Sequence, residues 1–253
     1  MPVPHGVDTS NMVKGLSSAE KIELLALLEE QERRKAGRKL LTYYPDDGPL
    51  RRELYPKHLE FFAAGAKYRE RLMLAGNRVG KTEGVGGYET TLHLTGQYPV
   101  WWQGKRFDRP TRVWASGKTN ETTRDIVQAK LCGPVTWRDG KKSVSGTGLI
   151  PAEAVGTTAW KSGVQDLIDV MHVKHVSGGW SMLGLKSYQQ GRGSFEGTEQ
   201  DVIWLDEEPP LDVYAECLVR TMTTRGVVLL TFTPLEGLSE VVLSFLPGGK
   251  LRA

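Results

Sequence analysis

The sequence predicts an α/β fold with a mostly parallel central β-sheet, helices on both of its faces, and an N-terminal helical appendage. The main observation is an alternation of short apolar runs with helical stretches, which is typical of parallel sheets covered by helices. A second observation is a glycine-bearing loop that follows one apolar run, and a third is an acidic cluster that follows another. The runs are Leu72–Leu74, Thr111–Ala115, Val202–Leu205 and Val227–Phe232, and the helical stretches include Asn120–Leu131 and Leu211–Thr221.

Composition is that of a soluble globular protein. The 253 residues are 39% hydrophobic, enough for a sizeable core, and their net charge of +3 is too mild to indicate nucleic-acid binding by itself. No apolar run approaches the ~18 residues of a membrane span, and there is no signal peptide. The two cysteines, Cys132 and Cys217, lack metal-ligand spacing, which favours a reducing compartment without disulfides.

The chain is expected to begin with a tail and an amphipathic helix, residues 1–45, ahead of a main domain, residues 46–246. Ser17 and Glu20 have the spacing of a capping box, in which each side chain bonds the backbone N–H of the other residue. The helix that follows has one apolar face and should end at a glycine. The apolar residues and the glycine are Ile22, Leu25, Leu28 and Gly37.

Ala75-Gly76-Asn77-Arg78-Val79-Gly80-Lys81-Thr82 has the pattern of a phosphate-binding loop, with alanine in place of the usual first glycine. Gly76 and Gly80 let the backbone turn its N–H groups toward phosphate oxygens, and the helix that follows adds the positive end of its dipole. Lys81 supplies a mobile cation for the β- and γ-phosphates, and the Thr82 hydroxyl can ligate Mg²⁺. Taken alone, the segment could also be a glycine-bearing surface turn.

Asp201-Val202-Ile203-Trp204-Leu205-Asp206-Glu207-Glu208 indicates a strand buried on both faces with carboxylates at its carboxyl end. Ligands of open α/β sheets bind at that edge, where the phosphate loop also lies. Asp206 is expected to hold Mg²⁺, and Glu207 to polarise a water for attack on the γ-phosphate. An N-cap or a solvated turn is the alternative for this segment alone. An Asp with a Glu beside it favours a nucleotide hydrolase over a nucleotide kinase.

A third segment completes the set of motifs. Val227-Val228-Leu229-Leu230-Thr231-Phe232-Thr233-Pro234 is a predicted buried strand that ends in hydroxyls. Thr231 and Thr233 can therefore report the presence or loss of the γ-phosphate by hydrogen bonding. Val170–Val176 and Trp180–Tyr188 are expected to form an inserted antiparallel hairpin.

With Gln190-Gly191-Arg192-Gly193-Ser194-Phe195-Glu196-Gly197, these motifs resemble the large subunit of tailed-bacteriophage terminases. The resemblance covers roughly Pro56 to Val242. Its most specific parts are Gly76 to Thr82, Trp204 to Pro210 and Thr231 to Pro234. It implies a P-loop NTPase fold of the RecA-like/ASCE type and an ATPase motor that drives double-stranded DNA into a procapsid.

The resemblance also assigns roles. In that family the first motif binds ATP, the Asp–Glu pair holds Mg²⁺ and activates water, and the strand-end hydroxyls couple hydrolysis to movement. Tyr55–Phe62 stands where an adenine-contacting segment precedes the phosphate loop, with His58 in place of the expected glutamine. Arg78 and Arg192 are the main candidates for a catalytic arginine, ahead of Arg124 and Arg138. Arg78 could act within its own subunit, and Arg192 could enter the site of a neighbour or form a salt bridge that orders its own loop.

The resemblance further implies partners: double-stranded DNA, the terminase small subunit and the portal protein of the procapsid. It implies a homo-oligomeric ring, expected to be a pentamer when assembled, whereas an isolated domain can be monomeric. The site of action would be the cytoplasm of the infected bacterial host, with no membrane. Residues 247–253 would begin the linker to an RNase H-type nuclease domain, so we expect no DNA cleavage by this chain.

Two alternative functions remain open at this point. A helicase-like DNA-dependent ATPase has loosely similar motifs but needs a second sheet domain, for which too few residues follow Pro234. A nucleotide-gated assembly module would bind ATP without significant turnover. Glu207 argues against that module, because a pure binding site has no use for a second acid there.

Overall fold

The structure is a computed structural model, and it describes residues 17–18, 20–27, 39–138, 140–234 and 237–246. The chain divides into two units, residues 1–37 and 38–253, which are described separately. None of the helices in the described part of the chain combines the length and the apolar character that a bilayer span requires.

In the first unit, residues 20–27 are helical and the predicted capping box is present. The backbone N–H of Ser17 donates to Glu20 Oε2 at 2.8 Å, and the backbone N–H of Glu20 donates to Ser17 Oγ at 3.3 Å. These bonds satisfy N–H groups that have no partner within the helix. Leu28 and the expected helix end at Gly37 lie outside the described residues.

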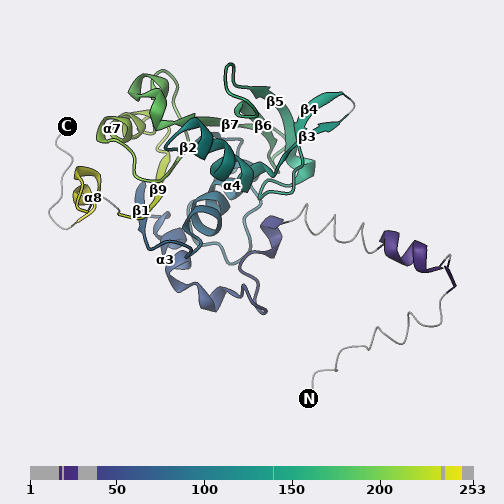
Figure 1. Cartoon of the computed structure of the whole chain (residues 1–253). Helices are drawn as coiled ribbons and strands as arrows, with labels where there is room; N and C mark the ends of the chain where they lie inside the picture. The colour runs from purple at the N-terminus through teal and green to yellow at the C-terminus, as the bar shows by residue number, and fades with distance from the viewer. Residues whose placement is uncertain (1–16, 19, 28–38, 139, 235–236, 247–253) are drawn as a thin grey trace, which may run out of the picture. The chain divides into compact units, whose positions relative to one another are not determined.

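The second unit is built on a seven-stranded sheet with the strand order β1-β9-β8-β2-β7-β6-β5 (Figure 1). The strands from β1 to β7 in this order run parallel, and β6 and β5 are antiparallel to their neighbours. The predicted mostly parallel sheet is confirmed. The strands are β1 Glu70–Leu74, β2 Arg112–Gly117, β5 Val155–Trp160, β6 Ile168–Lys174, β7 Trp180–Ser187, β8 Val202–Asp206 and β9 Val227–Phe232.

Helical elements connect these strands. They are η1 Lys39–Thr42, η2 Arg52–Leu54, α3 Pro56–Ala64, η3 Lys81–Gly87, α4 Tyr88–Thr95, α5 Asn120–Thr122, η4 Thr123–Gln128, α6 Ala129–Cys132, η5 Ala152–Ala154, η6 Tyr188–Gln190, η7 Arg192–Phe195, α7 Leu211–Arg220 and α8 Glu240–Ser244. The helix predicted from Asn120 to Leu131 corresponds to the continuous stretch α5–η4–α6. The helix predicted from Leu211 corresponds to α7.

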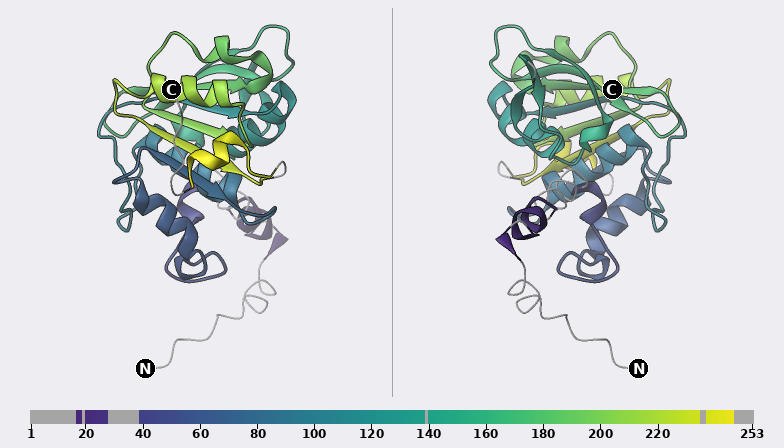
Figure 2. Two further views of the ribbon diagram at one scale, coloured as in Figure 1. Left: turned by 90° about the vertical axis from the view of Figure 1, so that its left-hand side faces the viewer. Right: turned by 90° about the vertical axis from the view of Figure 1, so that its right-hand side faces the viewer.

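Strands β8 and β9 are buried on both faces, as their continuous apolar sequences predict. One core holds Trp204 and Leu229 together with side chains of η3 and α4. The second core holds Ile203 and Leu230 together with side chains of α7 and α8. Helices therefore cover both faces of the sheet, with α4 and α7 on opposite sides (Figure 2).

The position of β9 identifies the sheet type. β9 pairs with β1, which precedes the glycine-bearing loop, and with β8, which ends in Asp206. One strand thus separates the loop strand from the acidic strand, which is the order of the RecA-like/ASCE fold. Because these strands are parallel, their carboxyl ends share one edge of the sheet.

The hairpin differs from its prediction. β7 and β6 are antiparallel, as expected, but β7 also pairs in parallel with β2 and so extends the main sheet. The hairpin is therefore part of the sheet rather than an insertion beside it. A separate two-stranded sheet, β3 Val135–Arg138 and β4 Lys141–Val144, was not predicted.

The main unit also begins earlier than the expected boundary at residue 46. The second unit starts at Arg38, and the side chains of Leu40 and Tyr44 are 1% and 2% exposed within its core. Tyr44 inserts into an aromatic cluster, and no local sequence pattern indicates this.

Candidate nucleotide site

The three sequence motifs converge at the carboxyl edge of the parallel sheet. The loop after β1 runs from Ala75 to Gly80, Glu207 follows β8, and Thr233 follows β9. The register pairs Leu74 with Phe232, and Asp206 with Thr231, so the last residues of the three strands lie level with one another. Topology alone therefore brings these distant segments together.

Lys81 is joined to the end of β9. Its Nζ donates to Thr233 Oγ1 at 2.8 Å and to the carbonyl oxygen of Gly76 at 3.3 Å, and the residue is only 6% exposed. Thr233 Oγ1 also lies 2.9 Å from the Ala75 carbonyl oxygen and 3.0 Å from Asn77 Oδ1. The hydroxyl of Thr233 thus connects the third motif directly to the phosphate loop.

Thr82 and Asp206 lie side by side at the base of the loop. Thr82 Oγ1 is 3.4 Å from Asp206 Oδ2, and Asp206 is 2% exposed. Burial raises the pKa of Asp206 to about 7, and the charge of Glu207 adds to this effect. The hydrogen bonds of Thr231 and Thr82 and the charge of Lys81 lower the pKa and offset part of the shift. A divalent cation would stabilise the charged form of a carboxylate that is buried away from water in this way.

Thr231 occupies a different place from the one expected. It is fully buried, and its hydroxyl donates to Asp206 Oδ1 at 2.7 Å while it accepts a bond from Trp204 Nε1 at 2.8 Å. A direct contact with a nucleotide, as the sequence suggested, does not fit this position. Thr231 instead holds the carboxylate of Asp206 from behind.

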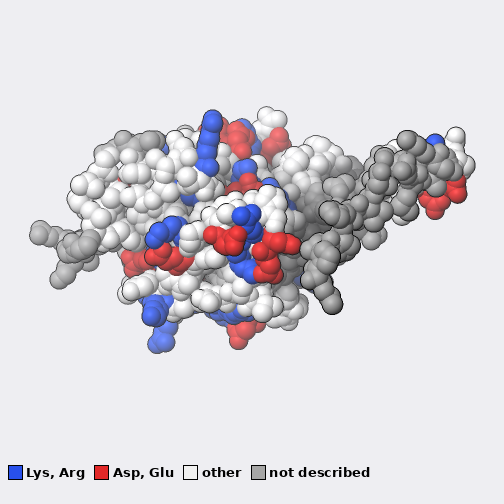
Figure 3. All heavy atoms as spheres, turned by 90° about the horizontal axis from the view of Figure 1, so that it is seen from below, with Lys and Arg blue, Asp and Glu red and all other residues white. Residues whose placement is uncertain are grey.

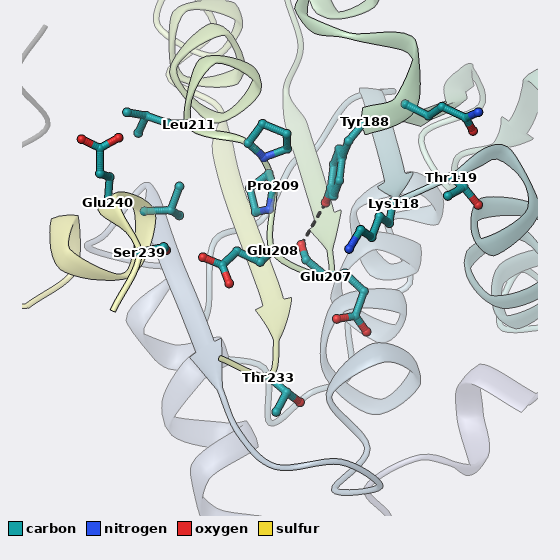
Figure 4. Close-up of a pocket in the computed structure, with 13 residues that line it drawn as sticks. Lys118, Thr119, Tyr188, Glu207, Glu208, Pro209, Leu211, Thr233, Ser239 and Glu240 are labelled. Carbon is teal, nitrogen blue, oxygen red and sulfur yellow. Dashed lines mark hydrogen bonds between the residues drawn. The ribbon is translucent and has the colours of Figure 1, made fainter. Parts of the chain in front are cut away.

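Glu207 borders a pocket of about 580 Å³ beside these residues (Figure 4). Its φ of +65° is unusual for a residue with a side chain. Two contacts hold its backbone: its N–H donates to the Thr231 carbonyl oxygen at 3.0 Å, and its own carbonyl oxygen accepts from the Tyr188 hydroxyl at 3.0 Å. In Figure 4 the side chain of Glu207 lies on the side of Lys118, and that of Glu208 turns toward Ser239.

The two arginine candidates have different surroundings. Arg78 is exposed, has a φ of +64°, and makes no ion pair among the described residues. Arg192 pairs with Glu216, with Nε and Nη2 at 3.0 and 2.9 Å from Oε2, and lies 3.6 Å from Glu196. Of the two interpretations of Arg192, the salt bridge within its own chain is the one present here.

The segment expected to contact adenine forms α3 and the turn before it. Tyr55 lines a pocket of about 190 Å³ beside the phosphate loop, together with Tyr43, Gly80 and Gly84. His58 lines the same pocket but is buried.

Sequence reasoning missed several residues at this edge. Tyr188 is one, and its hydroxyl bonds the carbonyl oxygens of both Asp206 and Glu207. Lys118 is another, since it follows β2 and lines the pocket of Glu207. Their signal was positional: each comes directly after a strand, so a correct strand order would have placed both at the carboxyl edge. Trp204 was predicted to lie in a buried strand, but no sequence pattern indicates its hydrogen bond to Thr231.

Comparisons with known proteins place the chain in a family. Residues 72–249 match the family described as terminase large subunit, T4likevirus-type, N-terminal. The chain is 38% identical over 252 residues to the terminase large subunit of Salmonella phage P22, covering 93% of this chain and 48% of that protein. It thus spans about half the length of that relative.

Two solved structures were also matched. Both are large terminases of a thermophilic bacteriophage, one of them in complex with ADP, with TM-scores of 0.46 and 0.45 at 10% and 12% identity. Each match covers 79% of this chain and 38% of the other. The family match spans most of the chain, and the identity to the P22 protein is well above the level expected by chance. This chain belongs to the family of phage terminase large subunits.

Proposed function

We propose that this chain is the ATP-hydrolysing motor part of a phage terminase and that it drives double-stranded DNA into a procapsid. One observation carries the proposal. Lys81 and Thr82 from the phosphate loop are hydrogen-bonded to Thr233 and Asp206 from two other strands. A lysine, two hydroxyls and a buried carboxylate at one sheet edge are the groups that a magnesium nucleotide requires.

In this proposal the phosphate loop binds ATP through the backbone from Gly76 to Gly80 and through Lys81. Lys81 exchanges its bonds to Thr233 and the Gly76 carbonyl for the β- and γ-phosphates. The exchange frees the Thr233 hydroxyl, which then reports the state of the γ-phosphate to β9. Asn77, Arg78 and Val79 complete the loop.

The donor set also fits Mg²⁺. Thr82 and Asp206 offer one hydroxyl and one carboxylate, and the described residues contain no cluster of three or more His, Cys, Asp or Glu that could cage a metal. Mg²⁺ is usually held by one or two protein oxygens together with phosphates and waters. When bound, it would neutralise charge on the phosphates. Trp204 and Thr231 keep the Asp206 carboxylate aimed at that position.

Glu207 is proposed as the general base. Its backbone is held on both sides by Thr231 and Tyr188, while its carboxylate makes no ion pair among the described residues. The side chain is therefore free to accept a proton from a water placed in line with the γ-phosphate. Arg78 is the proposed cation within the subunit. For Arg192 to enter a neighbouring site, its bonds to Glu216 would first have to break.

The DNA, the small subunit, the portal, the pentameric ring and the host cytoplasm belong to this proposal through family membership. On the face that Figure 3 shows, basic and acidic side chains of the described residues are intermixed, so charge does not mark a DNA surface on that face. A nuclease activity is not proposed for this chain.

Binding of Mg²⁺-ATP by calorimetry, and phosphate release with and without linear double-stranded DNA, test the proposal. We expect the purified chain to bind ATP and to release phosphate, and Lys81→Ala to abolish binding because the loop loses its cation. Lys174→Ala, which removes an exposed lysine of β6, is the matched control and should bind normally. ATP binding without any turnover would instead favour an assembly module, and normal binding by Lys81→Ala would refute the site.

A further inference from the structure

Tyr44 lies beneath the phosphate loop at the centre of an aromatic cluster. It is 2% exposed and has a φ of +55°, a backbone conformation that costs energy for a residue with a side chain. Its ring packs edge-on against several others, at centroid distances between 5.0 and 5.9 Å. These rings belong to Tyr55, His58, Phe62, Tyr88 and Trp101. The position of the Tyr44 hydroxyl is therefore fixed by packing.

That hydroxyl bonds the helix that begins at Lys81. It donates to the carbonyl oxygen of Gly84 at 2.7 Å and lies 2.7 Å from His58 Nδ1. A tyrosine hydroxyl has a single hydrogen. The Gly84 carbonyl oxygen accepts it, and the tautomer of the His58 ring sets the direction of the bond between Nδ1 and the Tyr44 oxygen.

His58 extends the contact to the loop itself. Its ring is buried, which lowers its pKa, against a smaller opposing effect from a hydrogen bond with the Val79 backbone. A Cβ at Gly80 would lie 3.4 Å from His58 Cε1, and a Cβ at Gly84 would lie 3.0 Å from the Tyr44 hydroxyl. His58 and Tyr44 therefore touch the loop at Gly80 and the first turn of its helix at Gly84.

These contacts use the hydrogen-bonding groups that Tyr44 and His58 could otherwise offer to a nucleobase. Tyr44 and His58 line the pocket of about 190 Å³, and the Tyr44 hydroxyl and His58 Nδ1 are already hydrogen-bonded to each other and, for Tyr44, to the Gly84 carbonyl oxygen. We propose that Tyr44 and His58 are positioning residues that hold the phosphate loop in its binding conformation, and that they do not read the nucleobase. This inference rests on the proposed nucleotide site.

Affinity for two ligands separates the two roles. Mg²⁺-ATP carries a base, whereas inorganic tripolyphosphate with Mg²⁺ carries only the phosphates. Tyr44→Phe keeps the ring and removes the hydroxyl, and His58→Phe keeps a ring without nitrogens. We expect each variant to lose about fivefold in affinity for both ligands, the factor that corresponds to one net neutral hydrogen bond. The double variant should lose less than the product of the two, because both side chains act through one chain of bonds.

Tyr55→Phe is the matched control, since Tyr55 lines the same pocket and its hydroxyl makes no hydrogen bond among the described residues. It should leave tripolyphosphate affinity unchanged. All measurements are made below the melting temperature of each variant, so that loss of folded protein does not contribute. If wild type binds neither ligand, the nucleotide site itself is refuted. If wild type binds both, weaker ATP binding with unchanged tripolyphosphate binding would mean that these residues read the base. Unchanged affinity for both ligands in both variants would mean that the loop is held elsewhere, and either result overturns the inference.

Discussion

The hydroxyl of Thr231 links the buried Trp204 to the carboxylate of Asp206, which is proposed to hold Mg²⁺. It accepts from Trp204 and donates to Asp206, so both of its hydrogen-bonding functions are used inside the core. Neither partner has another hydrogen bond through the same atom in the described residues. A buried donor or acceptor left without a partner costs about 1–3 kcal/mol.

Thr231→Val therefore tests this arrangement with almost no change in volume. We expect the free energy of unfolding to fall by about 2–4 kcal/mol, because the Trp204 indole N–H and one Asp206 oxygen lose their partner together. Urea unfolding followed by tryptophan fluorescence measures the change. Thr233→Val is the comparison: its site is partly exposed, so water can replace the lost bonds and the loss should stay below about 1 kcal/mol. Equal losses in the two variants would show that burial of Thr231 has no special cost.

Glu207 and Glu208 are adjacent, and we expect only Glu207 to act as a base. Glu207→Gln should bind ATP and hydrolyse it ~10²–10⁴ times more slowly, because the amide cannot accept the proton of the attacking water. Glu208→Gln should hydrolyse ATP at a rate close to wild type, since its side chain turns away toward Ser239 (Figure 4). Single-turnover phosphate release separates hydrolysis from product release. The reverse pattern would assign the base to Glu208.

The helix after the phosphate loop has packing contacts that its own sequence does not reveal. Glycines such as Gly84, Gly86 and Gly87 disfavour a regular helix, and the structure has a wider π-helical turn, η3, before the regular helix α4. The glycines have a steric reason. A Cβ at Gly86 would lie 2.1 Å from Trp204 Nε1, so this turn can pack on β8 only without a side chain. Such a fit depends on a partner far away in sequence, and no local pattern reveals it.

Gly86→Ala should therefore destabilise the protein although alanine favours helices. We expect a loss of about 1–3 kcal/mol in the free energy of unfolding, typical of overpacking, together with weaker ATP binding as η3 shifts away from Trp204. Gly193→Ala in η7 is the matched control, because a Cβ there meets nothing within 4 Å and its φ is not positive. Melting temperature and calorimetry report the two effects. A stabilised Gly86→Ala protein would contradict the close packing at this turn.

At the level of the whole molecule, the strands near the site were the most predictable part. Val227–Phe232 was predicted with the observed bounds, and Val202 and Leu74 were predicted as the first residue of β8 and the last of β1. β8 and β9 are apolar because both of their faces are buried, whereas β1 is only partly buried. Residues that act through tertiary contacts, such as Tyr44 and Tyr188, could not be placed, since they carry no motif and depend on strand order. The side chain of Arg192 forms an ion pair with α7 that the sequence left undecided.

A buried ionic cluster ties the edge of the sheet to two helices. Arg71 of β1 forms two bonds with Glu89 of α4, at 2.6 and 3.0 Å, and also donates to the Phe61 carbonyl oxygen of α3 at 2.8 Å. His93 Nε2 lies 3.1 Å from Glu89 Oε1, and its Nδ1 lies 2.8 Å from the Tyr98 hydroxyl. Burial lowers the pKa of His93, and this effect exceeds the opposite one of Glu89. Burial raises the pKa of Glu89, but Arg71 and His93 together bring it below its usual value.

These pKa shifts predict that mild acid destabilises the protein through His93. Because the pKa of His93 is lower in the folded chain than its usual 6.5, the unfolded chain binds the proton more readily. The stability that neutral His93 contributes is therefore present above that usual value and is lost as the pH falls below it, by at most ~1.4 kcal/mol per pH unit. In His93→Gln, whose amide can still donate to Glu89 and accept from Tyr98, this loss should disappear. Urea unfolding of both proteins from about pH 7.5 to 5.5 gives the free energy of unfolding of each as a function of pH. The difference between the two curves isolates His93, because the other titrating groups are common to both proteins. One of them is Asp206, whose raised pKa changes the stability with pH in the opposite direction. Parallel curves would show that His93 takes up no proton on unfolding, and would place the acid sensitivity elsewhere in the chain.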